Sequence, residues 1–299
     1  MQTGSCSPTA TRPAHAVCAW HRTLLTLLLL GVASTAFAQQ RPLVTEDPET
    51  IGAGRILLEG GMDLAHDQQY PVSGLKGNQL TIPTIGLSIG ISSIAELQID
   101  GGIYNRLHVT ERIPNAPLAS MLTFTGDSTH DVLDTVIATK IRINAEGPTR
   151  PSFGFRFATK LPNASNESGL GLDTTDVYIS VLGAKTVQSV RVVGNIGFAI
   201  LSDPTNGNRQ NDDLTYGLSF ARAVTQAAEI VGEVNGRVST RSGDAFPGTE
   251  TRGLLRLGGR FTKGTLRLDA GVFFGLTTID PTVGVTVGFT YVFNAFKVP

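Results

Sequence analysis

Cysteine and tryptophan are nearly absent from this sequence. Its two cysteines, Cys6 and Cys18, and its single tryptophan, Trp20, all lie close to the N-terminus, ahead of an apolar segment. If that segment belongs to a removable leader, the mature chain contains no thiol. A disulfide, a thiol nucleophile and a cysteine metal site are then excluded.

Long hydrophobic runs are scarce as well. Residues 24–32 are almost pure leucine, but this run is shorter than the roughly 20 apolar residues that a membrane-spanning helix needs. Ala36-Phe37-Ala38 provides the small residues that signal peptidase requires. We therefore expect residues 1–38 to be an export signal that is cleaved before Gln39. No later segment approaches a transmembrane helix.

An excess of positive charge is also missing. Removal of Arg12 and Arg22 with the signal leaves 22 of the 24 basic side chains against 25 acidic ones, a formal net charge of −3. This balance does not suit a nucleic-acid binder, so we expect no nucleic-acid partner. Residues 203–213 carry many oxygen atoms but lack the spacing and closing glutamate of an EF-hand loop. We expect no metal ion and no cofactor.

The chain does contain a strict alternation near its C-terminus, at residues 282–293. Apolar side chains occupy every second position of this segment: Val283, Val285, Val287, Phe289, Tyr291 and Phe293. Small or polar residues occupy the positions between: Gly284, Thr286, Gly288 and Thr290. Because successive side chains of a strand point to opposite faces, this segment would have one apolar face and one small, polar face.

Similar segments recur along the chain. We predict strands at residues 54–65, 79–91, 94–105, 131–145, 152–161, 174–185, 190–201, 213–222, 227–240, 251–262, 265–276 and 282–293. Most are longer than the strands of soluble proteins, which average about 5 to 6 residues, and suit a tilted membrane strand of about 9 to 11 residues. Their length favours a membrane barrel over a secreted β protein.

The predicted connections alternate between short turns and longer polar loops, which is the arrangement of outer-membrane barrels. We predict an all-β, antiparallel transmembrane β-barrel of about 12 strands at residues 54–293, with short periplasmic turns and longer extracellular loops. Residues 39–53 would form a lead-in or plug, and residues 294–299 a tail. The expected location is the outer membrane of a Gram-negative bacterium, with membrane lipid and the barrel-assembly machinery as partners.

Charged and amide side chains share the face opposite the apolar positions, and Asp63, Asn195 and Asn235 are among them. Lipid exposure of Arg or Lys at the membrane midplane costs roughly 2 to 4 kcal/mol, so we expect these side chains to face the lumen. The candidates are Arg55, Glu59, Glu96, Asp100, Lys140, Arg142, Arg156, Arg191, Glu233, Arg237, Arg252, Arg256, Arg260, Arg267 and Asp269.

Two interpretations of these charges remain open. They form either an ion-paired filling of a narrow barrel or the lining of a pore. In a pore, Arg252, Arg256 and Arg260 with neighbouring Arg267 would form a positive wall that favours anionic solutes, unless the acidic residues pair with them.

Residues 106–130 form the least ordinary connection, because an exposed loop of this length is usually polar. It contains an apolar group that includes Leu118, Met121 and Phe124. These side chains are candidates for a constriction that folds into the barrel. In the alternative, the segment packs over the barrel rim.

The histidines raise the question of catalysis. His66, His108 and His130 map to the predicted outer rim, where some twelve-stranded outer-membrane lipid hydrolases carry a serine and a histidine. In those phospholipases a serine follows the histidine by two residues, and none does so here. We therefore expect no catalytic residue and no enzymatic activity, and we keep an outer-rim lipid hydrolase that uses one of these histidines as the least favoured alternative.

Residues 41–55, with the sequence Arg-Pro-Leu-Val-Thr-Glu-Asp-Pro-Glu-Thr-Ile-Gly-Ala-Gly-Arg, continue into Leu57-Leu58-Glu59. This stretch resembles the family of phenol-degradation (MetA-pathway) outer-membrane proteins. The resemblance implies a transporter-like barrel that admits small organic or aromatic solutes. The alternative is a closed barrel that serves structure or surface interaction. From the residues alone, Thr45, Glu46 and Asp47 are a polar lead-in that could cap or plug the periplasmic mouth.

Overall fold

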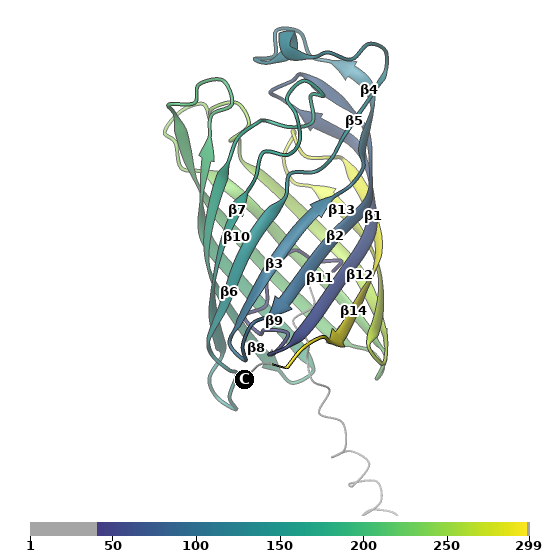
Figure 1. The fold of residues 1–299 in the computed structure, drawn as a ribbon, viewed down its shortest axis with the longest axis vertical. Helices are drawn as coiled ribbons and strands as arrows, with labels where there is room; N and C mark the ends of the chain where they lie inside the picture. The colour runs from purple at the N-terminus through teal and green to yellow at the C-terminus, as the bar shows by residue number, and fades with distance from the viewer. Residues whose placement is uncertain (1–40, 298–299) are drawn as a thin grey trace, which may run out of the picture. The chain divides into compact units, whose positions relative to one another are not determined.

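The computed structural model describes residues 41–297, which form a β-barrel (Figure 1). Its strands are β1 (Arg55–Tyr70), β2 (Leu75–Gly90), β3 (Ala95–Gly102), β4 (Asn105–Arg112), β5 (Ser128–Asp131), β6 (Val136–Asn144), β7 (Ser152–Lys160), β8 (Asp176–Val187), β9 (Val190–Ser202), β10 (Gln210–Ala223), β11 (Ala228–Ser239), β12 (Arg252–Lys263), β13 (Leu266–Gly275) and β14 (Val283–Asn294). A single turn of 3₁₀ helix spans Ala119–Met121. Within residues 41–297, no helix is long and apolar enough to cross a membrane. The predicted signal peptide and the last two residues of the tail lie outside the described residues.

Twelve of these strands close into a ring. Its order is β1-β14-β13-β12-β11-β10-β9-β8-β7-β6-β3-β2, and β2 pairs with β1 to complete it. Every pairing in the ring is antiparallel, so neighbouring strands satisfy each other's backbone groups and no edge is left open. The predicted all-β antiparallel barrel of about 12 strands is confirmed.

Two of the predicted connections are wrong because strands continue through them. β1 runs to Tyr70 and β2 begins at Leu75, so residues 67–78 are mostly an extended hairpin. Within the predicted connection 106–130, β4 pairs with the upper half of β2, and β5 pairs with β4. Polar residues hid this extension, because strands beyond the membrane no longer need an apolar outer face.

The barrel has a short-turn end and a long-loop end, which lie at the bottom and the top of Figure 1. Connections at the short-turn end include residues 91–94, 188–189 and 264–265. Those at the long-loop end include residues 113–127 and 161–175. On β14, Val285, Val287, Phe289, Tyr291 and Phe293 are exposed on the outside, whereas Thr286, Thr290 and Val292 are buried on the inside. The barrel therefore presents an apolar outer wall and a polar inner wall, as a lipid environment requires.

This orientation predicts a depth-dependent cost of charge on the outer wall. Ile196 lies midway along β9 with its side chain 57% exposed, so Ile196→Arg is expected to destabilise the folded barrel by about 2 to 4 kcal/mol. Urea titration of folding into phospholipid vesicles, followed by gel mobility, measures the change. The matched control is Val224→Arg, because Val224 is 62% exposed in a turn at the short-turn end and should tolerate a charge.

Candidate functional site

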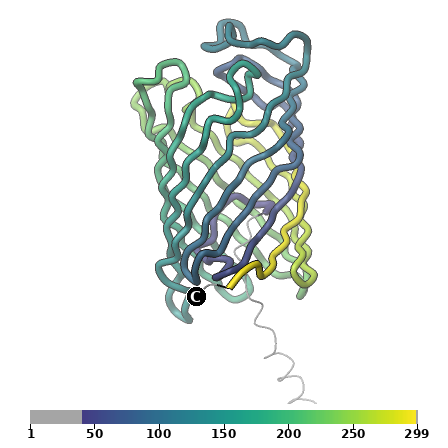
Figure 2. The backbone as a smooth tube through the Cα atoms, in the orientation of Figure 1, coloured from purple at the N-terminus to yellow at the C-terminus, as the bar shows by residue number. Residues whose placement is uncertain are grey.

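The N-terminal segment, residues 41–52, lies inside the barrel and follows its inner wall. Figure 2 shows the start of the described chain in purple within the lower part of the barrel. From Arg41 onward its residues contact wall strands in ring order, from β14 and β13 around to β3 and β2. Pro42 lies against Gly258 and Gly271, and Pro48 lies against Gly154. The segment therefore narrows the lumen from within.

Arg41 anchors the beginning of the segment. Its guanidinium donates hydrogen bonds to Thr84 Oγ1 at 3.0 Å and to Thr286 Oγ1 at 2.9 Å, and pairs with Asp269 at 3.5 Å. Gly61 and Gly288 flank it so closely that a Cβ at either position would overlap the guanidinium. Only glycine leaves this space. The Arg41 carbonyl in turn accepts a hydrogen bond from Arg260 Nε at 2.7 Å.

Glu46 lies at the centre of a buried ion cluster. Its carboxylate pairs with Arg156 at 3.0 Å and with Lys140 at 3.4 Å. Lys140 also pairs with Glu96 at 2.9 Å, and the side chains of both are fully buried. Glu96 further accepts a hydrogen bond from the Ile51 backbone at 2.7 Å. Because each ion in this cluster has an oppositely charged partner, the cluster ties the segment to β3, β6 and β7.

The next acidic residues continue this attachment toward the short-turn end. Asp47 pairs with Arg191, which donates a second hydrogen bond to it at 2.7 Å, and Glu49 pairs with Arg142. Arg191 also pairs at 3.0 Å with Glu146, a residue in the turn between β6 and β7. Burial raises the pKa of Glu146, but hydrogen bonds from Thr186 and Lys185 and the charge of Arg191 outweigh it and hold that pKa below its usual value.

Backbone groups of the segment are satisfied by the wall as well. Glu233 on β11 accepts hydrogen bonds from the backbone nitrogens of Val44 at 2.9 Å and Thr45 at 2.8 Å. Asn195 on β9 exchanges two hydrogen bonds with the Glu46 backbone, at 2.6 and 2.7 Å. A segment with no strand pairing of its own thus obtains the hydrogen bonds that buried backbone groups require.

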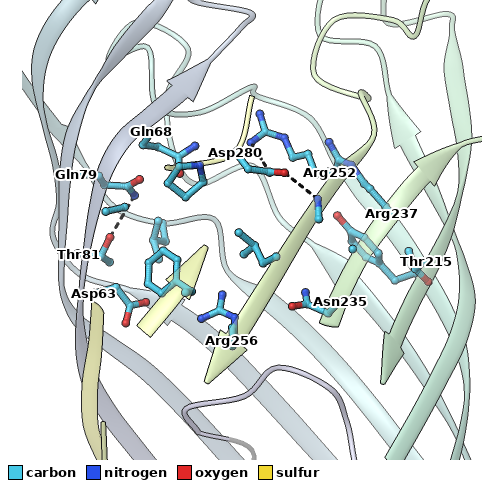
Figure 3. A pocket seen from close by; sticks show the side chains of 18 residues that line it. Asp63, Gln68, Gln79, Thr81, Thr215, Asn235, Arg237, Arg252, Arg256 and Asp280 are labelled. Atoms are coloured by element: carbon cyan, nitrogen blue, oxygen red, sulfur yellow. Dashed lines mark hydrogen bonds and ion pairs between the residues drawn. The ribbon is translucent and has the colours of Figure 1, made fainter. Parts of the chain in front are cut away.

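Above the segment, toward the long-loop end, two cavities of about 460 and 450 Å³ follow one another. Arg41, Pro42 and Glu46 line the lower cavity, and Arg237 and Arg252 line the upper one, which is shown in Figure 3. Both cavities share a border, which is formed by Asp63, Leu133, Tyr178 and Arg256. A further cavity of about 250 Å³ beneath the long loops shares Gln68, Tyr178, Arg237 and Arg252 with the upper cavity.

The arginines of β12 and β13 do not form an unopposed positive wall. Arg252 lies 3.8 Å from Asp280, and Arg256 lies 3.4 Å from Glu233. Glu229 lies 3.9 Å from both Arg260 and Arg267. The acidic residues pair with this ladder, as the alternative interpretation allowed, so the ladder alone gives no reason to expect anion selectivity.

The predicted lumen residues fall into three groups. Those that contact the N-terminal segment are Glu59, Glu96, Lys140, Arg142, Arg156, Arg191, Glu233, Arg260 and Asp269. Those that line the cavities include Asp100, Arg237, Arg252 and Arg256. Arg267 instead pairs with Glu229, and the stem of Arg55 lies beside Gly52. The partners supplied by Arg41, Glu46, Asp47 and Glu49 were not identified from the sequence, because they lie far along the chain from the wall residues with which they pair.

The loop between β4 and β5 lies at the rim. Phe124 packs with Leu122 against a buried cluster of Leu75, Leu107 and Val109, while Met121 is 46% exposed. The Leu118 backbone nitrogen donates to the Val72 carbonyl at 2.9 Å. None of Leu118, Met121 and Phe124 lines one of the lumen cavities described above. The β4–β5 hairpin carries this loop outward, which corresponds to the rim-packing alternative rather than to a constriction.

The three histidines also lie toward the long-loop end. His66 Nδ1 is 2.7 Å from Asn78 Oδ1, and the His130 ring lies 5.6 Å from the Tyr104 ring. No hydrogen bond joins a histidine to a serine in the described part of the chain. Within the same residues, no group of three or more His, Cys, Asp or Glu side chains could hold a metal ion. The expected lack of enzymatic activity stays a prediction.

A closed antiparallel barrel with an apolar exterior and a charged interior defines a transmembrane β-barrel. Among solved structures, the COG4313 outer membrane channel from Pseudomonas putida F1 is similar, with a TM-score of 0.57 and 13% identity over 83% of this chain and 98% of that chain. At this identity the likeness shows the fold alone. The translocator domain of the autotransporter NalP from Neisseria meningitidis matches more weakly, with a TM-score of 0.45 and 13% identity over 92% of this chain and 97% of that one.

The toluene transporter TodX from Pseudomonas putida is weaker still, with a TM-score of 0.38 and 9% identity over 84% of this chain and 92% of that chain. Likenesses at this level carry no functional argument. No family model and no curated protein matches the sequence. The resemblance of residues 42–59 to the phenol-degradation family therefore stays a prediction.

Proposed function

We propose that this protein is a passive channel for small organic solutes in the outer membrane of a Gram-negative bacterium. The observation that carries this proposal is the succession of cavities from the long loops to the N-terminal segment, each sharing lining residues with the next. A barrel that only needed filling would not require a succession of adjoining cavities through its upper half. In this location its partners are membrane lipid and, during biogenesis, the barrel-assembly machinery.

The lining suits small organic solutes better than large or purely ionic ones. Leu133, Tyr178 and Phe273 provide apolar and aromatic surface beside charged groups in the upper cavity. A cavity of about 450 Å³ lies at the lower end of the size range of small-molecule sites, which is about 300 to 1,000 Å³. The N-terminal segment sets the size limit below it.

Planar-bilayer recording and vesicle swelling with the refolded protein test the proposal. We expect discrete conductance steps and a solute flux that falls steeply as neutral solutes grow larger. Protein-free vesicles and bilayers of the same lipid composition are the control. If the folded protein gives neither conductance nor flux, the passive channel is ruled out.

The specific observation in favour of a closed barrel is the ion-paired attachment of the N-terminal segment in the lower half. Under that alternative, the long loops would bind a surface partner and the lumen would serve only stability. The same recordings distinguish the two functions, because a closed barrel passes neither ions nor solutes. Deletion of the loop at residues 113–127 would then abolish partner binding and leave permeability unchanged.

A further inference from the structure

Two buried side-chain oxygens without a hydrogen-bond partner among the described protein atoms belong to residues that line the upper cavity. They are Asp63 Oδ1 on β1 and Asn235 Oδ1 on β11. Arg256 on β12 lines the same cavity, and Figure 3 labels all three residues around its lower part. Buried polar groups are nearly always hydrogen-bonded, so unpartnered oxygens on residues of one cavity point to a ligand that supplies the missing donors.

Arg256 is the donor of this group. Its Nε forms an ion pair with Glu233 at 3.4 Å and its guanidinium carbon lies 4.9 Å from the centre of the Phe273 ring, but its terminal nitrogens donate no hydrogen bond to a described residue. Glu233 is already committed to the Val44 and Thr45 backbone nitrogens. The neighbouring Arg237, in contrast, donates to the carbonyls of Glu250 at 3.1 Å and Gly248 at 2.8 Å. Arg256 therefore keeps a guanidinium edge with which to bind a carboxylate.

Asp63 and Asn235 are the acceptors. Asp63 forms no ion pair within 4.0 Å with any described residue, although it lines the same two cavities as Arg256. Asn235 contributes a second acceptor oxygen on β11, which β14, β13 and β12 separate from β1. The Asp63 carboxylate can bind an ammonium group, because that group donates three hydrogen bonds and carries the complementary charge.

Two of these groups lie at the border between the two cavities, on the path that a solute would take through the proposed channel. Asp63 and Arg256 both belong to the border between the upper and lower cavities, together with Leu133 and Tyr178. The border thus presents a negative group from β1, a positive group from β12 and the largely apolar side chains of Leu133 and Tyr178. A simple anion would satisfy Arg256 but be repelled by Asp63, and a simple cation would meet the reverse.

We infer that this border binds a small zwitterion of the α-amino acid type, with its carboxylate on Arg256 and its ammonium on Asp63. The side chain of such a solute would lie against Leu133 and Tyr178. This inference rests on the proposed channel function, because it names the class of solute that the channel selects. Binding occurs without any covalent step.

The test compares L-serine with solutes of similar size: lactate as anion, ethanolamine as cation and glycerol as neutral solute. Vesicle flux of each is measured, and equilibrium binding of radiolabelled L-serine to the refolded protein is measured in parallel because it needs no flux. We expect serine to cross faster than glycerol and to bind saturably. Hydrogen bonds to charged groups contribute enough that Asp63→Asn or Arg256→Gln should weaken serine binding roughly tenfold or more.

The two variants should also shift selectivity in opposite directions. Asp63→Asn should favour lactate and Arg256→Gln should favour ethanolamine, whereas a general loss of folding would lower every flux together. Asp244→Asn and Arg222→Gln, at exposed positions, are the matched controls. Equal flux of serine and glycerol with no saturable serine binding overturns the zwitterion site while the channel stands. Serine binding without flux of any solute supports the site and refutes the channel.

Discussion

Deletion of residues 41–51 is expected to raise the single-channel conductance of the barrel severalfold. This segment follows the inner wall from β14 around to β3 and fills the lower part of the lumen, so its removal widens the narrowest region. The closed ring of twelve strands does not include the segment, so the barrel itself should persist. Planar-bilayer recordings of the refolded deletion variant against the intact protein measure the effect.

A full-length control separates loss of the segment from loss of its attachment. The triple variant Glu46→Gln, Asp47→Asn and Glu49→Gln keeps the segment at full length. It removes the ion pairs with Lys140, Arg156, Arg191 and Arg142. We expect the single-channel conductance of this triple variant to fluctuate between the value of the intact protein and that of the deletion variant. Unchanged conductance in both variants would mean that the N-terminal segment does not limit the pore.

Substitution of Lys140 is expected to cause the largest loss of stability. In Lys140→Met, Glu96 and Glu46 lose their shared cation while Glu96 stays fully buried. Removal of one partner from a buried ion pair leaves a charge uncompensated, which costs about 3 to 5 kcal/mol. The free energy of unfolding in phospholipid vesicles, from urea titration followed by gel mobility, gives the measurement.

The exposed residue Lys263 provides a matched control, because Lys263→Met makes the same chemical change at the end of β12. It should alter the free energy of unfolding by no more than a few tenths of a kcal/mol. Addition of Glu96→Gln to Lys140→Met should recover part of the loss, since it removes the orphaned charge. A Lys140→Met variant as stable as the Lys263→Met variant would contradict the buried cluster.

The barrel was predictable because its pattern is local. Every second residue of β14 faces outward, so Val285, Val287 and Phe289 identify the strand with no knowledge of what lies beside it. The same period identified most of the ring. It failed at β4 and β5, where Asn105, Arg106 and Ser128 belong to strands beyond the apolar band and the outward positions are no longer apolar.

For the lumen, the sequence predicted which side chains face inward but not which of them pair with one another. Alternation assigned Glu96, Lys140 and Glu233 to the inner wall, but the partner of each depends on residues far away along the chain. Glu46 is 94 residues from Lys140, and no periodicity connects them. The polar N-terminal segment was predicted as a lead-in or plug, but it has no strand pattern, so nothing local indicated which wall residues it contacts.

The sequence by itself determined the class of this protein. A two-residue period in long segments and charges confined to one face require a barrel, because lipid accepts apolar side chains and rejects unpaired backbone and charge. Only the tertiary structure decided what the barrel contains. Closure of the ring brought Arg41 to Asp269, Glu46 to Lys140, and Asp63 to the same passage as Arg256, since electrostatic partners are chosen by distance in space and not by separation along the chain.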